Sequence, residues 1–216
     1  MKKIITISRE YGSGGHSIGK MVAQLLDIPF YDKELIDMSA KDSGLSPDFI
    51  RNTEQNLSSG LLYTLLLGAS YAAPGTGSVI TPNAPVGLNT PLADQVFNAQ
   101  RKVIISLAKK GPCVIVGRCA DYILSQSPDI NTDDVMNVFI YAPLKDKVQR
   151  AIEQKGLDPA TAEKDVKLID KRRANHYNTF TEQTWGKRCH YDLLVNSSLF
   201  GLEKTAEFIA EAVRRT

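Results

Sequence analysis

The sequence is poor in the features that mark secreted or zinc-binding proteins. Its 216 residues include only three cysteines, Cys113, Cys119 and Cys189, and no two of them have CxxC spacing. An odd number of scattered cysteines does not suit a disulfide framework and fits reduced thiols in a cytoplasmic protein. The three histidines add too few ligands for a zinc site, so we expect structural cysteines and no zinc.

Long apolar runs are also missing. The longest candidate, 61–73, is interrupted by Thr64, Gly68 and Ser70 and stops at Pro74, short of the ~20 apolar residues that a membrane span requires. The apolar run after Lys3 is too short for the core of a signal peptide. We therefore expect no membrane partner and a cytoplasmic location.

The chain has no excess of charge of one sign. The formal net charge is +2, and the charged and hydrophobic shares, 23% and 43%, are ordinary for a globular protein. Nucleic-acid-binding domains usually carry a strongly basic face, so we expect no nucleic-acid partner. A chain of this length can form one α/β domain with a sizeable core.

Short apolar segments alternate with segments of helical periodicity. Buried strands are predicted at 3–8, 29–31, 113–116, 135–141 and 193–195. Helices are predicted at 17–26, 33–41, 92–109, 145–154, 158–182 and 202–215, and another is predicted to begin after Ser46. Asp32 is the predicted N-cap of the helix at 33–41. This alternation predicts a parallel sheet with helices on both faces.

The segment from Ile5 to Lys20, ITISREYGSGGHSIGK, combines a buried strand, a glycine-rich turn and the start of a helix. That order directs free backbone N–H groups and the positive end of a helix dipole at one spot, which predicts a phosphate site. The glycines also have a purely structural interpretation, in which they only make a tight turn between the strand and the helix.

Two alignments with the phosphate-loop pattern GxxxxGK[ST] are open. One begins at Gly14 and supplies the lysine as Lys20, but Met21 then replaces the hydroxyl that binds Mg²⁺. Helical periodicity already includes this stretch, so Lys20 would lie a turn inside the helix.

The other alignment begins at Arg9, directly after the strand. It is favoured because the helix predicted from periodicity then begins where the phosphate-loop pattern requires a helix to begin. It puts Gly15 in the place of the lysine, and His16 or Ser17 in the place of the hydroxyl. The lysine normally bridges the β- and γ-phosphates, so its charge must come from elsewhere.

Charged residues follow the predicted strands at the edge where parallel sheets bind ligands. Arg118 comes directly after the strand at 113–116, and its guanidinium suits a bidentate contact with phosphate. An ion pair with Asp121, on the same helical turn, is the alternative. One face of the helix at 158–182 either attracts phosphate or is simply solvated. Its basic residues are Lys164, Lys167, Lys171 and Arg172.

Several motifs together resemble the cytidylate kinase-like family: YGSGGHSIGK, IPFYDKELI, PLADQVFNAQ, GPCVIVGRCADYIL and DKRRANHYN…WG…HYDLLVNSS. The resemblance extends over nearly the whole chain. It implies a three-layer α/β fold of the P-loop NTPase type, with the parallel sheet between helices. It also implies one domain, 1–216, with a core formed by 1–54, 92–155 and 190–216. A helical region that binds nucleoside monophosphate, 55–91, and a short basic lid, 156–189, complete it.

The activity that the resemblance implies is transfer of the γ-phosphoryl group of ATP, with Mg²⁺, to CMP, dCMP or a similar small phosphate acceptor. The implied acceptor-binding residues are Asp32, Arg118 and Asp121. Catalytic charge would come from Arg118, Arg150, Arg172 and Arg173, which would replace the missing lysine. ATP would be held by Gly12, Ser13, Gly14, Gly15, His16, Ser17, Asn196 and Ser197, with Ser17 also binding Mg²⁺.

Other interpretations remain open on the residues alone. The missing lysine and the long glycine- and proline-rich segment 72–91 also fit a nucleotide-binding regulator that has lost catalysis. The composition of 55–91 differs from a compact monophosphate-binding lobe, which fits a kinase for another small acceptor. The apolar segment 55–73 could instead join copies of the chain into a homo-oligomer.

Overall fold

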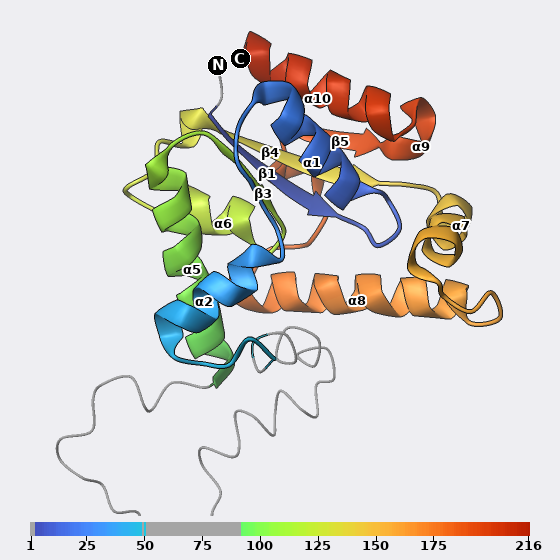
Figure 1. The fold of residues 1–216 in the computed structure, drawn as a ribbon, viewed down its shortest axis with the longest axis horizontal. Helices are drawn as coiled ribbons and strands as arrows, with labels where there is room; N and C mark the ends of the chain where they lie inside the picture. The colour runs from blue at the N-terminus through green and yellow to red at the C-terminus, as the bar shows by residue number, and fades with distance from the viewer. Residues whose placement is uncertain (1–2, 49, 51–91) are drawn as a thin grey trace, which may run out of the picture.

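The computed structural model describes residues 3–48, 50 and 92–216 and contains a five-stranded parallel sheet between helices (Figure 1). The strands lie in the order β2-β3-β1-β4-β5. Their bounds are β1 (Ile4–Arg9), β2 (Phe30–Tyr31), β3 (Cys113–Val116), β4 (Val135–Tyr141) and β5 (Leu193–Asn196). In the central strand β1, Ile7 is in register with Val116 of β3, and Arg9 with Ile140 of β4. The ends of these three strands therefore lie at one edge.

Helices connect the strands and flank the sheet. They are α1 (Gly15–Leu26), α2 (Glu34–Ser43), α5 (Leu92–Lys110), α6 (Ala120–Ser125), α7 (Leu144–Lys155), α8 (Ala162–Thr181), α9 (Ser197–Phe200) and α10 (Leu202–Arg215). Two short 3₁₀ turns are Thr132–Asp134 and Arg188–His190. In Figure 1, α8 lies alongside the strand ends and α7 joins it to β4.

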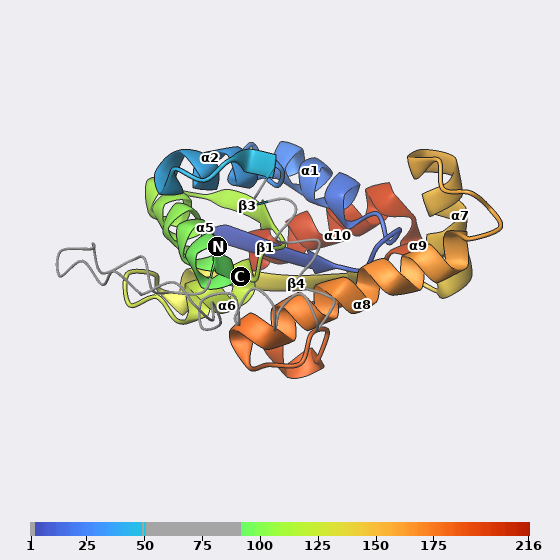
Figure 2. The same ribbon diagram turned by 90° about the horizontal axis from the view of Figure 1, so that it is seen from below.

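The sheet is buried on both faces because successive residues of its strands point to opposite sides. Ile5 and Ile7 pack in one core with Ile18 of α1 and Ile209 of α10. Ile4 packs on the other face, in a core formed mainly with α5 and α6 (Figure 2). The three-layer α/β fold that the apolar runs predict is confirmed.

Two local predictions are wrong. Lys33, not Asp32, is the N-cap of α2, and the Asp32 carboxylate faces cations at the sheet edge instead. The alignment that begins at Gly14 also fails, because α1 begins at Gly15 and Lys20 is exposed in its second turn. The short helices α6 and α9 were not predicted, since neither is long enough to show periodicity.

Some predictions fall on parts of the chain outside the described residues. These are the monophosphate-binding region 55–91, the oligomer segment 55–73 and the long segment 72–91. Within 3–48 and 92–216, no helix combines the length and apolarity needed to cross a membrane. The three cysteines are free thiols, with Cys113 and Cys119 buried and Cys189 exposed.

Candidate functional site

The glycine-rich loop runs from the end of β1 to the start of α1. Gly12 and Gly14 have φ values of +75° and +81°, which favour glycine, and no side chain caps the helix at Gly14. The first N–H groups of an α-helix have no intrahelical acceptor, so the N-terminal turn of α1 directs donors and a positive dipole outward. Ser17 is half-buried in that turn.

Contacts from α7 and α9, which are distant from the loop in the sequence, fix this loop. Ser197 is fully buried and donates its hydroxyl to the Ser13 carbonyl oxygen at 2.6 Å. Arg150 donates to the Gly12 carbonyl at 3.2 Å and to the Ser198 hydroxyl at 2.9 Å. A Cβ on Gly12 would overlap the backbone carbonyl of Lys147 in α7. These contacts hold the backbone of the loop, and position 12 has room only for glycine.

Helix α8 is joined to the other side of the loop through a buried charge network. Asp170 accepts the Tyr11 backbone N–H at 2.6 Å and the Lys147 ammonium at 2.8 Å. Lys147 also pairs with Glu10 at 2.9 Å. Burial alone would lower the pKa of Lys147, but hydrogen bonds to Asp170 and Glu10 raise it above the ordinary value. This network holds the helix of the predicted lid against the loop.

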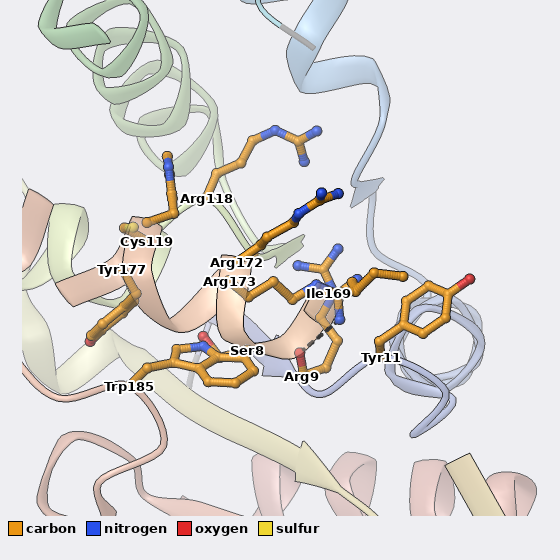
Figure 3. Close-up of a pocket in the computed structure, with 12 residues that line it drawn as sticks. Ser8, Arg9, Tyr11, Arg118, Cys119, Ile169, Arg172, Arg173, Tyr177 and Trp185 are labelled. Carbon is orange, nitrogen blue, oxygen red and sulfur yellow. Dashed lines mark hydrogen bonds between the residues drawn. The ribbon is translucent and has the colours of Figure 1, made fainter. Parts of the chain in front are cut away.

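An arginine-lined cavity of about 480 Å³ opens beside the loop, between the ends of β1 and β3 and helix α8 (Figure 3). Its lining residues include Arg9, Arg118, Arg172 and Arg173. Figure 3 shows the side chains of these arginines gathering in one part of the cavity, with Tyr177 and Trp185 at its other end. The volume suits a small-molecule ligand, and the guanidinium groups suit an anionic one.

Backbone strain accompanies the placement of Arg118. Gly117, Arg118 and Cys119 have successive φ values of +76°, +54° and +55°, although the last two carry side chains that disfavour this region. Such strain persists where surrounding contacts over-determine the conformation. Arg118 donates to the backbone oxygen of Asp32 at 2.8 Å and lies 3.4 Å from its carboxylate. Arg118 therefore pairs with Asp32, which is distant in the sequence, and the alternative of an ion pair between Arg118 and Asp121 is not what the structure has.

Asp32 is a buried carboxylate among cations. Its Oδ1 lies 3.5 Å from Arg9 Nη2, and its Oδ2 lies 2.5 Å from His16 Nδ1. Burial would raise the pKa of Asp32, but Arg9, His16 and Arg118 together bring it below the ordinary value. Asp32 does not line the cavity and instead holds the arginines that do.

Arg172 and Arg173 are neighbours on α8 with different surroundings. Arg173 donates to the Arg9 carbonyl oxygen at 3.0 Å and lies 5.5 Å from the Tyr11 ring centroid. Among the described residues, Arg172 has no hydrogen bond or ion pair, and its Nε is buried. A half-buried guanidinium without a protein acceptor in that part of the chain is suited to an anionic ligand.

Asp121 does not line the cavity but is hydrogen-bonded to Tyr177, which does. The carboxylate is 3% exposed, and its Oδ2 accepts the Tyr177 hydroxyl at 2.8 Å. Burial raises the pKa of Asp121 above the ordinary value, against the hydrogen bond from Tyr177, which lowers it. Tyr177 and Trp185, which line the cavity, were not among the predicted site residues.

Arg9 is another cavity residue that was not among the predicted site residues, although it is the starting point of the favoured alignment. Its departure from the first glycine of GxxxxGK[ST] was the available signal. Of the predicted ATP-binding residues, His16 contacts Asp32, and the Asn196 side chain accepts the Ser198 N–H at the start of α9. Ser13 and Ser197 use their hydroxyls within the loop framework.

The loop suits a Mg²⁺–nucleotide more than an all-protein metal site. Within the described residues, no three His, Cys, Asp or Glu side chains cluster as metal ligands. Mg²⁺ in phosphate sites is commonly held by few protein ligands and by phosphate oxygens, and Ser17, the predicted Mg²⁺ ligand, lies in the first turn of α1.

Comparison with known proteins gives a family and a fold. The model of the cytidylate kinase-like family matches residues 4–199. A solved structure of an uncharacterized protein from Eubacterium ventriosum ATCC 27560 is similar along 100% of both chains, with 26% identity and a TM-score of 0.68. No match is found among curated proteins.

More distant solved structures share the fold. Shikimate kinase from Acinetobacter baumannii in complex with shikimate has a TM-score of 0.53 and 13% identity, over 100% of this chain and 94% of that one. TT1252 from Thermus thermophilus has a TM-score of 0.54 and 15% identity, over 99% and 97% of the two chains. The parallel sheet with its helices is thus the fold of P-loop kinases.

Proposed function

The chain belongs to the cytidylate kinase-like family, and we propose that it transfers the γ-phosphoryl group of ATP to a small phosphate-bearing acceptor such as CMP or dCMP. The observation that carries this proposal is the cavity with four arginines directly beside a glycine-rich loop at a helix N-terminus. Anionic groups are favoured in both places, and the two places adjoin.

The residues divide into donor and acceptor roles. Backbone N–H groups of 12–17 hold the donor phosphates, and Ser17 supplies a ligand for Mg²⁺, which neutralises charge on the phosphates when bound. Asn196, half-buried at the end of β5, contacts the nucleoside part of the donor, and the fully buried Ser197 holds the loop through the Ser13 carbonyl oxygen. Arg118, aimed by the strained turn and by Asp32, holds the acceptor phosphate.

The remaining arginines act from α7 and α8. Arg172 neutralises the phosphoryl group in transit, since its guanidinium faces the cavity without a partner among the described residues. Arg173 and Arg150 position the strand end and the loop through their bonds to Arg9 and Gly12. Asp121 acts on the acceptor through Tyr177 rather than by direct contact.

A panel of acceptors tests the proposal. The purified full chain is assayed with ATP and Mg²⁺ against CMP, dCMP, UMP, AMP and shikimate, with ADP release as the readout. Turnover on one or more monophosphates, abolished by Arg118→Ala and kept by Arg215→Ala, is expected. Arg215 is a matched control because its side chain is 78% exposed at the end of α10. Turnover on shikimate alone would contradict a phosphate-bearing acceptor.

One observation favours a second function. Gly15 stands where a phosphate loop has its lysine, and this departure suits a regulator that binds nucleotide without transferring phosphate. Binding of ATP with no turnover on any acceptor would favour that alternative.

A further inference from the structure

The favoured alignment contains two departures from the phosphate-loop pattern, and they are complementary in charge. Arg9 stands where the first glycine is expected, and Gly15 stands where the lysine is expected. One position gains a cation and the other loses one. The two positions are six residues apart, at opposite ends of the loop.

The structure brings these two positions into contact. A Cβ on Gly15 would lie 2.5 Å from the Cβ of Arg9 and 2.8 Å from its Cγ. Real Cβ atoms do not approach other carbons so closely, so the stem of Arg9 occupies the space that a side chain at position 15 needs. A lysine at position 15 and an arginine at position 9 therefore exclude one another in this backbone.

A second glycine, Gly117, leaves the space that the Arg9 guanidinium occupies. A Cβ on Gly117 would overlap Nη1 of Arg9, so the side chain passes over the bare backbone at the end of β3. Asp32 lies 3.5 Å from Nη2, and Arg173 holds the carbonyl oxygen of Arg9 at 3.0 Å. The side chain is 19% exposed and lines the cavity (Figure 3). It thus extends from the first turn of α1 to the acceptor side.

We infer that Arg9 supplies the positive charge that a phosphate loop normally takes from its lysine, and this inference rests on the proposed function. The guanidinium stays protonated and contacts the phosphoryl group between donor and acceptor. In that step the bond from the γ-phosphorus to the β–γ bridging oxygen breaks, and its electron pair leaves with ADP. A bond from an acceptor oxygen to the same phosphorus forms, and any proton on that oxygen passes to solvent.

Besides Arg172, to which a role at the transferring phosphoryl group is already assigned, three arginines near the loop are less suited to replace the lysine. Arg150 is bound to the Gly12 carbonyl and to two serine hydroxyls, and Arg173 is bound to backbone. Arg118 is directed at Asp32 on the acceptor side. Arg9 alone among these four has its stem against Gly15, in the place of the missing lysine.

A charge-swap experiment tests the inference. Arg9→Ala should lower kcat about 10²–10³-fold, the usual cost of removing one donor to a transition-state charge. Gly15→Lys alone should lower the melting temperature, because the new side chain collides with Arg9. In the double variant Arg9→Gly/Gly15→Lys, the colliding Cβ and Cγ of residue 9 are gone and the lysine is back, so stability should return and kcat should recover at least tenfold relative to Arg9→Gly alone. Arg215→Ala should match the wild type in both measurements.

A binding measurement separates this inference from the proposed function. With Mg²⁺, the wild type should bind the non-hydrolysable analogue adenylyl imidodiphosphate more tightly than ADP, and Arg9→Ala should lose that preference while keeping its ADP affinity. If the wild type turns over none of the acceptors, the proposed function fails and this titration alone decides the role of Arg9.

A second variant of Arg9 keeps the test valid even if Arg9→Ala does not fold. If Arg9→Ala does not fold, Arg9→Met retains the apolar stem against Gly15 without the charge, and the same losses are expected. Wild-type kcat in a folded variant without the charge would overturn the inference. An unchanged preference for the analogue over ADP would overturn it equally.

Discussion

The glycine-rich loop and the arginine-lined cavity lie at the same edge of the sheet but have opposite compositions. The loop, 12–17, has no lysine or arginine and offers backbone N–H groups and the Ser17 hydroxyl. The cavity is lined by four arginines from β1, α8 and the turn after β3. The difference teaches that the positive side chains at this edge of the sheet lie outside the loop, and the proposed phosphoryl transfer therefore depends on them.

The comparison also shows how the two regions are joined. Asp32 lies between them, because it contacts His16 at the start of α1 and Arg9 and Arg118 at the cavity. Helix α8 joins them a second time, with Asp170 bound to Tyr11 and Arg173 bound to Arg9. A change in one region is therefore expected to reach the other through these contacts.

The largest expected effect separates the two neighbouring arginines of α8. Arg172→Ala should lower kcat about 10³-fold, comparable with loss of an arginine that neutralises a transferring phosphoryl group. The melting temperature should stay near that of the wild type, since Arg172 has no protein partner among the described residues. Arg173→Ala should instead lower both kcat and the melting temperature, because it also loses the bond to the Arg9 carbonyl. Steady-state kinetics and thermal melts measure the two quantities.

Lys167→Ala is the matched control for these variants. Lys167 lies on the same helix, but its side chain is 60% exposed and pairs with Glu163 one turn earlier. Exposed pairs of this kind contribute little, so kinetics and melting temperature should both be unchanged. If Arg172→Ala kept the kcat of the wild type, the proposed catalytic role of Arg172 in α8 would be contradicted.

The second prediction concerns the loop. Gly12→Ala should lower the free energy of unfolding by about 2–4 kcal/mol, because it adds a strained φ to a collision with the Lys147 carbonyl. Gly44→Ala is the control, since Gly44 has a similar φ of +72° but open space around its missing side chain. The control should lose only about 1 kcal/mol in a urea titration. Equal losses would show that the loop is not held by α7.

The third prediction concerns acid stability at the junction of the two regions. The pKa of Asp32 is lower in the folded chain than its ordinary value of 3.8. The carboxylate therefore stabilises the fold above that value, and the stabilisation is lost as the pH falls through the folded pKa. Asp32→Asn should flatten the pH dependence of unfolding in this acid window. Because the amide also releases Arg118, kcat/KM for the acceptor should fall about tenfold or more at neutral pH.

An unchanged acid profile in Asp32→Asn would mean that the cations do not stabilise this carboxylate. Asp129→Asn is a suitable control for that measurement. Its exposed carboxylate pairs with Lys109 far from the cavity, and exposed pairs contribute little to stability.

The framework could be predicted from the sequence because it depends on local pattern. The apolar runs of β1, β3 and β4 and the periodicity of α1, α5 and α10 each lie within one continuous segment. The start of α1 could also be predicted closely enough to put Lys20 inside the helix, as the structure has it. The arginine at position 118 follows directly from the end of a buried strand.

The finer geometry of the site depends on contacts that one sequence does not reveal. The pairing of Arg118 with Asp32 spans 86 positions, and that of Arg173 with Arg9 spans 164. The collision between Arg9 and a side chain at position 15 depends on the loop conformation, which Ser197 and Lys147 help to fix. Asp32 was assigned as a helix cap because short-range patterns favour that role, but the cations nearby attract its carboxylate more strongly.

The smallest expected effect sharpens the contrast between two buried aspartates at this edge. Burial raises the pKa of Asp121, so the folded chain binds its proton more tightly than the unfolded chain. Stability from this group is therefore present below the ordinary pKa and is lost as the pH rises through the folded value, the reverse of Asp32. Asp121→Asn keeps an acceptor for the Tyr177 hydroxyl and has no charge. Its free energy of unfolding, relative to the wild type, should rise across that window. The cost of a buried amide N–H is independent of pH and cancels in this slope, so a flat difference between the two proteins would show that burial does not perturb Asp121.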